Sequence, residues 1–210
     1  MHNLKLAAPQ HEDHEYLTGI PELQEEAHKA QAYEYLQSIH MMGRYACISG
    51  IIRAMKCRSV LDVGCGEGTL CTYLGSTASY LGIDVSGTAI SRARSKNPTT
   101  EGREFIAGDF RKLISLVQGR QFDAIVWAGI GLGWRESQDG PWIESLLPIV
   151  RQFQELAHDK SILVFESLYE YLDALMPLFA SLSPVTGIDL FMPFAGAHNR
   201  RFIRVLSPRP

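Results

Sequence analysis

The sequence contains no apolar run of the ~18–20 residues that a membrane-spanning helix requires. Residues 1–5, MHNLK, do not form the basic and then apolar leader of a secreted protein. Basic residues are not in excess, because 20 Lys and Arg stand against 23 Asp and Glu, for a formal net charge of −3. We therefore expect a soluble cytoplasmic protein with no membrane contact, and nucleic acid is disfavoured as a partner.

Cysteine is scarce, and its spacing matches no metal-binding motif. Cys47, Cys57, Cys65 and Cys71 include no C-x-x-C pair and have no clustered histidines beside them. We interpret them as reduced structural thiols rather than as zinc ligands.

The composition that remains is globular, with 46% hydrophobic and 20% charged residues in a chain of 210. This length fits one domain, and no repeat or linker divides the chain. We expect a mobile polar arm over residues 1–20, N-terminal helices over 21–57 and a core over 58–210. Within the second segment, one helix is expected over 21–42 with a stop at Gly43, and another over 45–55.

Beyond residue 58, short apolar runs alternate with amphipathic segments, which is typical of β-α-β units around a parallel sheet. Strands are expected near 59–63, 79–83, 103–107, 122–127, 161–166, 185–192 and 200–206, and helices near 67–75, 87–96, 111–117, 142–157 and 168–181. The link at 193–199 is so short that the last two strands must form an antiparallel hairpin. The predicted fold is Rossmann-like, doubly wound α/β.

A glycine-rich loop follows the first strand. Residues 60–70, VLDVGCGEGTL, lead from the strand into a helix, and glycine is needed where backbone bends and approaches a ligand. The dinucleotide fingerprint G-x-G-x-x-G requires glycine at position 69, which is Thr69 here, so a pyrophosphate site is disfavoured. Asp62 lies inside the strand, so the pattern suits a nucleoside that carries a cationic amino-acid group.

Two further acids end the next two strands. Asp84 is placed to accept hydrogen bonds from both hydroxyls of a ribose. Asp109 is placed to accept from an adenine amino group, and Phe110 offers a backbone contact or an apolar wall. One such acid alone is as often a helix cap, but acids at consecutive strand ends favour a ligand site.

These motifs resemble those of the class I S-adenosylmethionine-dependent methyltransferases, through VLDVGCGEG at 60–68, GIDVS at 82–86, AGDF at 107–110 and FDAIVW at 122–127. The resemblance implies a seven-stranded sheet with an antiparallel last strand, S-adenosylmethionine as cofactor and S-adenosylhomocysteine as product. It implies that the glycines approach the methionine part, that Asp84 holds the ribose and that Asp109 and Phe110 read the adenine. The implied cofactor-binding residues are Asp62, Gly64, Cys65, Gly66, Gly68, Asp84, Val85, Asp109, Phe110, Ala128 and Arg44.

The N-terminal helices cover the cofactor as a lid in related enzymes, and there Arg44 would meet the methionine carboxylate. The alternative is an ordinary core face around Leu36 and Ile39, with an exposed Arg44 that needs no ligand.

Motifs of several methyltransferase subclasses are absent. Residues 127–130, WAGI, replace the Pro-Pro-aromatic motif of exocyclic-amine nucleic-acid enzymes, and no cysteine follows a proline as in cytosine-C5 enzymes. Ala128 and Gly129 stand where metal-dependent enzymes carry carboxylates, so we expect no catalytic metal.

The acceptor site is expected in the loops at 128–141, 166–170 and 193–199, at the carboxyl ends of the strands. The candidate substrate-binding residues are Trp134, Arg135 and Tyr169, and the candidate catalytic residues are His198, Glu166 and His40. His198 could act as a general base, and Glu166 could bind an amine or accept a proton. Their alternatives are structural: a turn residue for His198, a helix cap for Glu166 and packing for Trp134.

We therefore expect methyl transfer from S-adenosylmethionine to an oxygen or nitrogen of a small, biosynthetic metabolite. A non-catalytic cofactor-binding module that acts through a partner is one alternative. A protein or RNA methyltransferase is another, although the sequence has no basic recognition face. The acceptor and the oligomeric state do not follow from the sequence.

Overall fold

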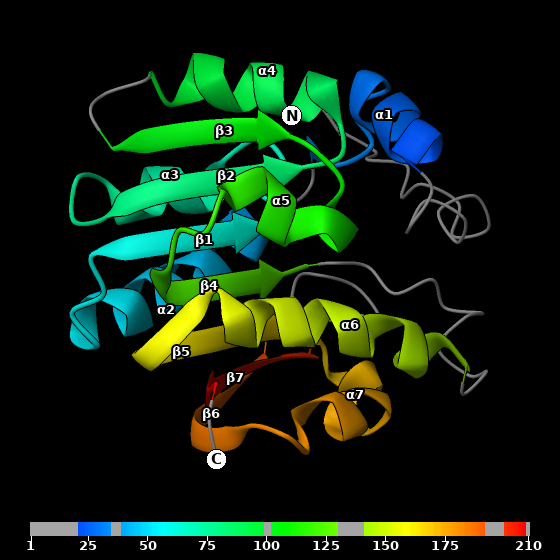
Figure 1. Cartoon of the computed structure of the whole chain (residues 1–210). Helices are drawn as coiled ribbons and strands as arrows, with labels where there is room; N and C mark the ends of the chain where they lie inside the picture. The colour runs from blue at the N-terminus through cyan, green and yellow to red at the C-terminus, as the bar shows by residue number, and fades with distance from the viewer. Residues whose placement is uncertain (1–20, 35–38, 99–101, 130–140, 192–199, 209–210) are drawn as a thin grey trace, which may run out of the picture.

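Seven strands form one sheet at the centre of the molecule, with helices on both faces (Figure 1). The structure is a computed structural model and describes residues 21–34, 39–98, 102–129, 141–191 and 200–208. The strands are β1 (Ser59–Val63), β2 (Ser79–Asp84), β3 (Arg103–Ala107), β4 (Phe122–Ala128), β5 (Ala157–Leu168), β6 (Ser183–Phe191) and β7 (Arg200–Ser207). Their order across the sheet is β3-β2-β1-β4-β5-β7-β6.

Strands β1 to β6 run in one direction, and β7 runs against them between β5 and β6. The predicted doubly wound sheet with an antiparallel last strand is therefore confirmed. The ends of β1 to β6 lie along one edge of the sheet, which we call the carboxyl edge. The starts of the same strands lie along the opposite edge, the amino edge.

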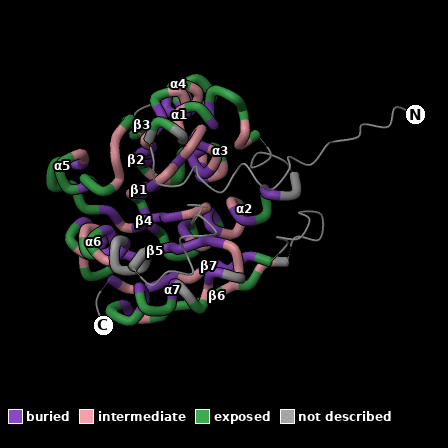
Figure 2. The backbone as a smooth tube through the Cα atoms, turned by 90° about the vertical axis from the view of Figure 1, so that its right-hand side faces the viewer, coloured by how far each residue is buried: buried purple, intermediate pink, exposed green. Residues whose placement is uncertain are grey.

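Two layers of helices bury the two faces of the sheet. The helices are α1 (Pro21–Lys29), α2 (Ile39–Ala54), α3 (Thr69–Leu74), α4 (Gly87–Lys96), α5 (Leu113–Val117), α6 (Pro141–Glu155) and α7 (Leu172–Phe179). Apolar residues of α5, α6 and α7 pack on one face, and those of α2, α3 and α4 pack on the other. Figure 2 shows the result, with buried residues along the strands in the middle and exposed residues mostly on the outer helices.

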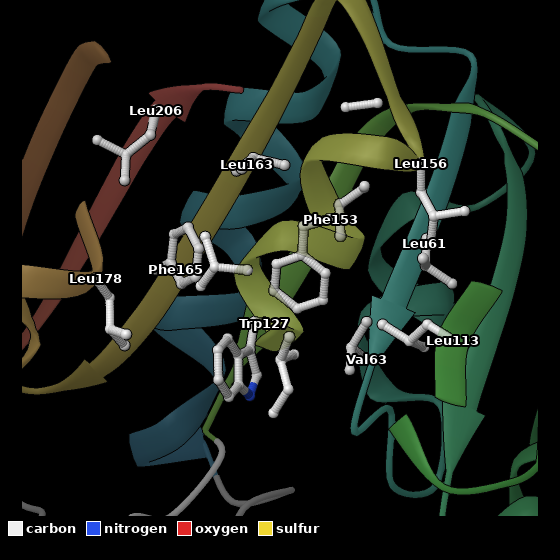
Figure 3. Packing of buried hydrophobic residues seen from close by; sticks show 14 of the residues in the cluster. Leu61, Val63, Leu113, Trp127, Phe153, Leu156, Leu163, Phe165, Leu178 and Leu206 are labelled. Carbon is white, nitrogen blue, oxygen red and sulfur yellow. The ribbon is translucent and has the colours of Figure 1, made fainter. Parts of the chain in front are cut away.

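Aromatic side chains fill the first of these layers next to the carboxyl edge (Figure 3). The ring of Trp127, on β4, meets Phe153 of α6 edge-on at 5.4 Å between centroids and lies 5.9 Å from Phe165 of β5. Such pairs add to the free energy gained by burying the rings. These ring contacts hold the ends of β4 and β5 in place. The loops predicted to bind the methyl acceptor follow these two strands.

The N-terminal helices differ from the prediction. Helix α1 ends at Lys29, and Gly43, predicted as a helix stop, lies inside the continuous helix α2. The predicted stop was wrong because a glycine inside a helix costs only about 1 kcal/mol. The burial of Ile48 and Ile52 against the sheet outweighs that cost.

Other boundaries shift less. Strand β5 begins four residues earlier than predicted, at Ala157, because that residue pairs with Phe122 of β4. A 3₁₀ turn at Tyr169–Tyr171 replaces the first turn of the helix predicted over 168–181. The predicted arm over 1–20 lies outside the described residues. Among the described helices, none is both long enough and apolar enough to cross a membrane.

Candidate functional site

The glycine loop leaves β1 in a backbone conformation that favours glycine. Gly64, Gly66 and Gly68 have φ angles of 74°, 52° and 75°, in the left-handed region. Gly68 is also required for packing, because a Cβ there would lie 2.9 Å from Nδ2 of Asn97. Around Gly66 the space is open, and a Cβ would meet only Cε1 of His28, at 4.0 Å. The loop is thus packed at one end and accessible in its middle.

Asp84 fastens this loop to the end of β2. The N–H of Gly66 donates to Oδ2 of Asp84 at 2.8 Å, and the N–H of Ser86 donates to Oδ1 at 2.9 Å. Burial raises the pKa of Asp84, and these two hydrogen bonds oppose that rise. Each carboxylate oxygen can accept a further hydrogen bond, as a ribose hydroxyl would require.

Asp62 lies beneath the loop rather than at its surface. The hydroxyl of Tyr80 donates to its Oδ2 at 2.5 Å. Burial raises the pKa of Asp62 to about 7, partly offset by that hydrogen bond. A carboxyl that is buried and paired within the chain supports the loop from below. The geometry therefore favours this role over the predicted direct contact with a cationic ligand group.

Asp109 has the helix-cap role that the sequence left open. Its Oδ1 accepts from the N–H of Arg111 at 2.9 Å, and the Arg111 guanidinium pairs with the same carboxylate. This contact lowers the pKa of Asp109. Phe110 beside it packs near Trp127, with ring centroids 6.4 Å apart. Asp109 remains partly exposed, so a cap and a ligand contact are compatible.

Helix α1 lies across the carboxyl edge beside β2 and the start of α4 (Figure 1). Its Glu25 accepts from the hydroxyls of Ser86, at 2.7 Å, and Thr88, at 2.5 Å. The hydrogen bonds from Thr88 and Ser86 lower the pKa of Glu25 to about 2. Arg92 of α4 donates to the backbone oxygen of His28 at 2.8 Å. The start of α4 therefore holds α1 in place beside Asp84.

His28 is the site residue that the sequence analysis missed. It is 5% exposed, lies against Gly66 and interacts electrostatically with Asp84. Its Nδ1 is buried without a hydrogen-bond partner, and burial lowers its pKa. Buried polar atoms normally have a partner, so this nitrogen indicates a group that a ligand would supply. No local pattern marks His28, because its place depends on how α1 packs.

Comparison with known proteins agrees with this geometry. A family model described as a methyltransferase domain matches residues 60–148, from β1 into α6. The N-methyltransferase NodS from Bradyrhizobium japonicum WM9, in complex with S-adenosylhomocysteine, is 14% identical with a TM-score of 0.68 and covers 87% of this chain and 97% of its own. The magnesium protoporphyrin IX methyltransferase ChlM from Synechocystis PCC 6803, with bound S-adenosylmethionine, is 12% identical with a TM-score of 0.68. The match covers 89% of this chain and 96% of the ChlM chain.

Residues 60–148 match a methyltransferase domain, and the fold is that of S-adenosylmethionine-dependent methyltransferases. TrmN from Thermus thermophilus is also similar, at 17% identity and a TM-score of 0.59, over 75% of this chain and 47% of its own. At such identities the likeness of the solved structures shows the fold. No curated protein matches the chain.

A buried ion cluster lies at the ends of β4 and β5. Arg44 of α2 donates from Nη1 to Oε2 of Glu166 at 3.2 Å and from Nη2 to the hydroxyl of Tyr45 at 2.5 Å. Arg201 of β7 donates from Nε to the other oxygen, Oε1, of Glu166. A Cβ at Gly129 would lie 2.7 Å from Nη1 of Arg44, so glycine at 129 makes room for the guanidinium.

This cluster overturns one expectation, for Arg44, and weighs against another, for Glu166. Arg44 is 1% exposed, so the alternative of an exposed arginine is wrong. Burial alone would raise the pKa of Glu166, but the guanidiniums of Arg44 and Arg201 lower it below its usual value. A carboxylate that stays ionised with both oxygens paired is a poor proton acceptor. The arrangement therefore argues against a catalytic Glu166.

The remaining candidates are only partly placed. Ala128 ends β4 opposite Glu166, and Val85 follows Asp84 at the end of β2. Tyr169 opens the 3₁₀ turn after β5, with the Arg200 guanidinium 4.1 Å from the centre of its ring. The structure does not describe the side chain of His40 or the residues Trp134, Arg135 and His198.

The cysteines and the acids form no metal site where the chain is described. Cys47, Cys57, Cys65 and Cys71 are free thiols. Cys65, in the glycine loop, is buried, and burial raises its pKa well above the usual value. No group of three His, Cys, Asp or Glu side chains in the described ranges could hold a metal ion.

Proposed function

We propose that this methyltransferase moves a methyl group from S-adenosylmethionine to an oxygen or nitrogen of a small molecule, without a metal ion. Two similar structures support parts of this proposal: ChlM is named for a small acceptor, magnesium protoporphyrin IX, and NodS is named for transfer to nitrogen. The net charge of −3 gives no support to a nucleic-acid substrate. A cytoplasmic location fits this proposal.

The cofactor-binding proposal rests on the contact between Asp84 and the glycine loop. Asp84 holds Gly66 at the end of β2 and retains lone pairs for two ribose hydroxyls. The open space at Gly66 and the unpartnered Nδ1 of His28 adjoin that carboxylate. In this proposal Asp109 and Phe110 contact the adenine, and Gly64 and Gly66 border the methionine part.

The cofactor supplies an electrophilic methyl group on a sulfonium centre. The chain's own contribution is then to align the acceptor and keep out water. Helix α1, held by Glu25 and Arg92, would cover the ribose side of the site. With Glu166 paired to two guanidiniums, the proposed proton acceptors are His198 and His40.

We further propose that residues 58–210 form the transferase core and that the described helices within 21–57 act as its cover. Helix α1 contacts α4, and α2 packs against α3 and the sheet, so both helices adjoin the glycine loop. Trp134, Arg135 and Tyr169 remain the proposed acceptor-binding residues.

Calorimetric titration with S-adenosylmethionine and S-adenosylhomocysteine tests the function. The wild-type chain should bind both, and Asp84→Ala should weaken binding by about 1.5–3 kcal/mol, the range for hydrogen bonds to a charged group. Asp189→Ala, at an exposed carboxylate of β6, is the matched control and should bind like the wild type. An unchanged affinity in folded Asp84→Ala would remove Asp84 from the ribose site. Formation of S-adenosylhomocysteine with an added acceptor distinguishes an enzyme from a binding module.

A further inference from the structure

The two arginines that bind Glu166 differ in how many of their Nη groups have a hydrogen-bond partner within the described residues. Arg44 is buried, with 1% of its surface exposed. Its Nη1 donates a hydrogen bond to Glu166, and its Nη2 donates one to the hydroxyl of Tyr45. Arg201 uses only its Nε, on Glu166, and its side chain is 8% exposed. In the described part of the chain, neither Nη of Arg201 has a hydrogen-bond partner. The four N–H donors on its Nη atoms have no partner in the described part of the chain, and these atoms are not among the fully buried ones, so a ligand can reach them.

Glu166 cannot satisfy these donors, because both of its oxygens are already taken. Oε1 accepts from Arg201 Nε, and Oε2 accepts from Arg44. The nearest carboxylate on β6, Asp189, pairs with Arg204 at 3.0 Å instead. Asp189 is paired in register with Phe202, so it lies on the opposite face of the sheet from Arg201. The two Nη groups of Arg201 are therefore free of partners from these carboxylates, and a further anion could accept their hydrogen bonds.

Arg201 lies on the acceptor side of the carboxyl edge. It is in register with Leu168, the last residue of β5, and Glu166 is in register with Ala128, the last residue of β4. The glycine loop follows β1, on the other side of β4. In open α/β sheets, ligands bind outside the carboxyl ends of the strands. A group bound to Arg201 would thus lie beside the cofactor site, away from Asp84.

We propose that the Nη groups of Arg201 bind a carboxylate of the methyl acceptor, so that the acceptor belongs to the class of small anionic molecules. A guanidinium presents paired N–H donors in a planar fork that matches the two oxygens of a carboxylate. Glu166 holds the fork in place through Nε, which reduces the entropy lost on binding. This inference rests on the proposed function, because the anion is carried by the acceptor.

The test compares probes that differ only in charge. The full wild-type chain, saturated with S-adenosylhomocysteine, is unfolded thermally with benzoate or benzamide, and with propionate or propionamide. We expect the acid of at least one pair to raise Tm by about 3–5 °C at a tenfold excess over its Kd, and its amide to have little effect. Saturation with S-adenosylhomocysteine fills the cofactor's own carboxylate site, so a remaining effect of the acid reports a second anion site.

Three variants assign the effect to Arg201. Arg201→Met should abolish the preference for the acid, and Arg201→Lys, which keeps the charge but loses the fork, should retain only part of it. Arg204→Met removes an arginine of the same strand that is already paired with Asp189, so it should leave the preference unchanged. Binding of S-adenosylhomocysteine to each variant shows that it is folded. The comparison of acid with amide in the wild type needs no variant.

Each other result overturns a defined part of the proposal. Equal effects of acid and amide in both pairs overturn the inference, as does a preference that survives in Arg201→Met. A preference that disappears when S-adenosylhomocysteine saturates the protein places the anion in the cofactor site and also overturns it. A wild-type chain that does not bind S-adenosylhomocysteine overturns the proposed function, and this inference with it.

Discussion

Polar side chains at the two edges of the sheet differ in whether the chain supplies all of their hydrogen-bond partners. At the amino edge, Asp123 accepts from the backbone N–H groups of Arg58 and Ser59 and pairs with His158 at 2.8 Å. Ser161 closes the same group by accepting from the N–H of His158 and donating to the backbone oxygen of Phe122. Every partner in this group is supplied by the chain.

At the carboxyl edge the chain completes some polar groups, such as Glu166 with its two arginines, and leaves others incomplete. His28 has a buried Nδ1 without a partner, and Arg201 has two Nη groups without one among the described residues. The acids there, Asp62 and Asp84, have raised pKa values because they are buried. A polar group completed by the chain stabilises the fold, whereas one left incomplete at the carboxyl edge is available to a ligand. The following predictions test that distinction.

The largest effect is expected where a buried ion pair is broken. Arg44→Met should lower the free energy of unfolding by about 3–5 kcal/mol, because Glu166 would keep only one of its two guanidiniums in a buried setting. Urea unfolding at pH 7 measures this loss. His158→Ala, at the amino edge, is the control and should lose about 1 kcal/mol or less. Similar losses in the two variants would contradict the larger stabilisation assigned to the buried pair over the partly exposed one.

The second prediction concerns the sign of the pH dependence at Asp62. With a pKa of about 7 in the fold, Asp62 keeps its proton between pH 4 and 7, whereas the unfolded chain releases it. The unfolding free energy should therefore fall as pH rises through that window. Asp62→Asn removes this contribution, so its stability relative to the wild type should rise by about 2–4 kcal/mol from pH 4 to pH 7. A constant difference would show that Asp62 is ionised throughout; Asp189→Asn is the surface control.

The glycine loop and the acids at successive strand ends could be predicted from the sequence because local rules govern them. Backbone turns with positive φ favour glycine, as at Gly64 and Gly66, and a parallel sheet brings successive strand ends to one edge. Gly43 was misinterpreted because its apolar neighbours on α2 are buried by the sheet, which a local pattern does not reveal.

The roles of His28, Arg44 and Glu166 could not be predicted because contacts between distant segments create them. Arg44 and Glu166 are 122 residues apart in the chain and meet only once α2 packs on β5. His28 reaches Gly66 only because Glu25 anchors α1 to the start of α4. Both relations depend on tertiary packing, to which periodicity and spacing are insensitive.

The third prediction tests the incomplete group at His28. If a ligand supplies the partner of Nδ1, His28→Ala should weaken the binding of S-adenosylhomocysteine by about 0.5–1.5 kcal/mol, or two- to tenfold, the net value of one hydrogen bond. Calorimetry measures the change, and His158→Ala, a histidine at the amino edge, is the matched control. Tighter binding by His28→Ala would instead mean that the side chain occupies space that the cofactor needs.

The smallest effect is expected at Asp123, with a sign opposite to that at Asp62. Partial burial disfavours its ionisation, but the N–H groups of Arg58 and Ser59 and the contact with His158 outweigh burial and lower its pKa. An acid with a lowered pKa contributes stability that is present above its unfolded value of ~3.9 and is lost as pH falls through the folded value. The Asp123 side chain is 29% exposed, so solvent screening limits the contribution to about 1 kcal/mol or less.

Asp123→Asn should therefore be less stable than the wild type at pH 7, and the difference should shrink as pH falls from about 5 to 3. Urea unfolding across that range measures it, with Asp62→Asn studied alongside. We expect the stability difference from the wild type to change with pH in opposite directions for the two variants, although both replace an aspartate, because the two aspartates lie at opposite ends of the strands. If the stability differences of both variants change with pH in the same direction, the burial of Asp62 does not raise its pKa above the unfolded value. The two edges of the sheet would then not differ in how they affect a carboxyl group.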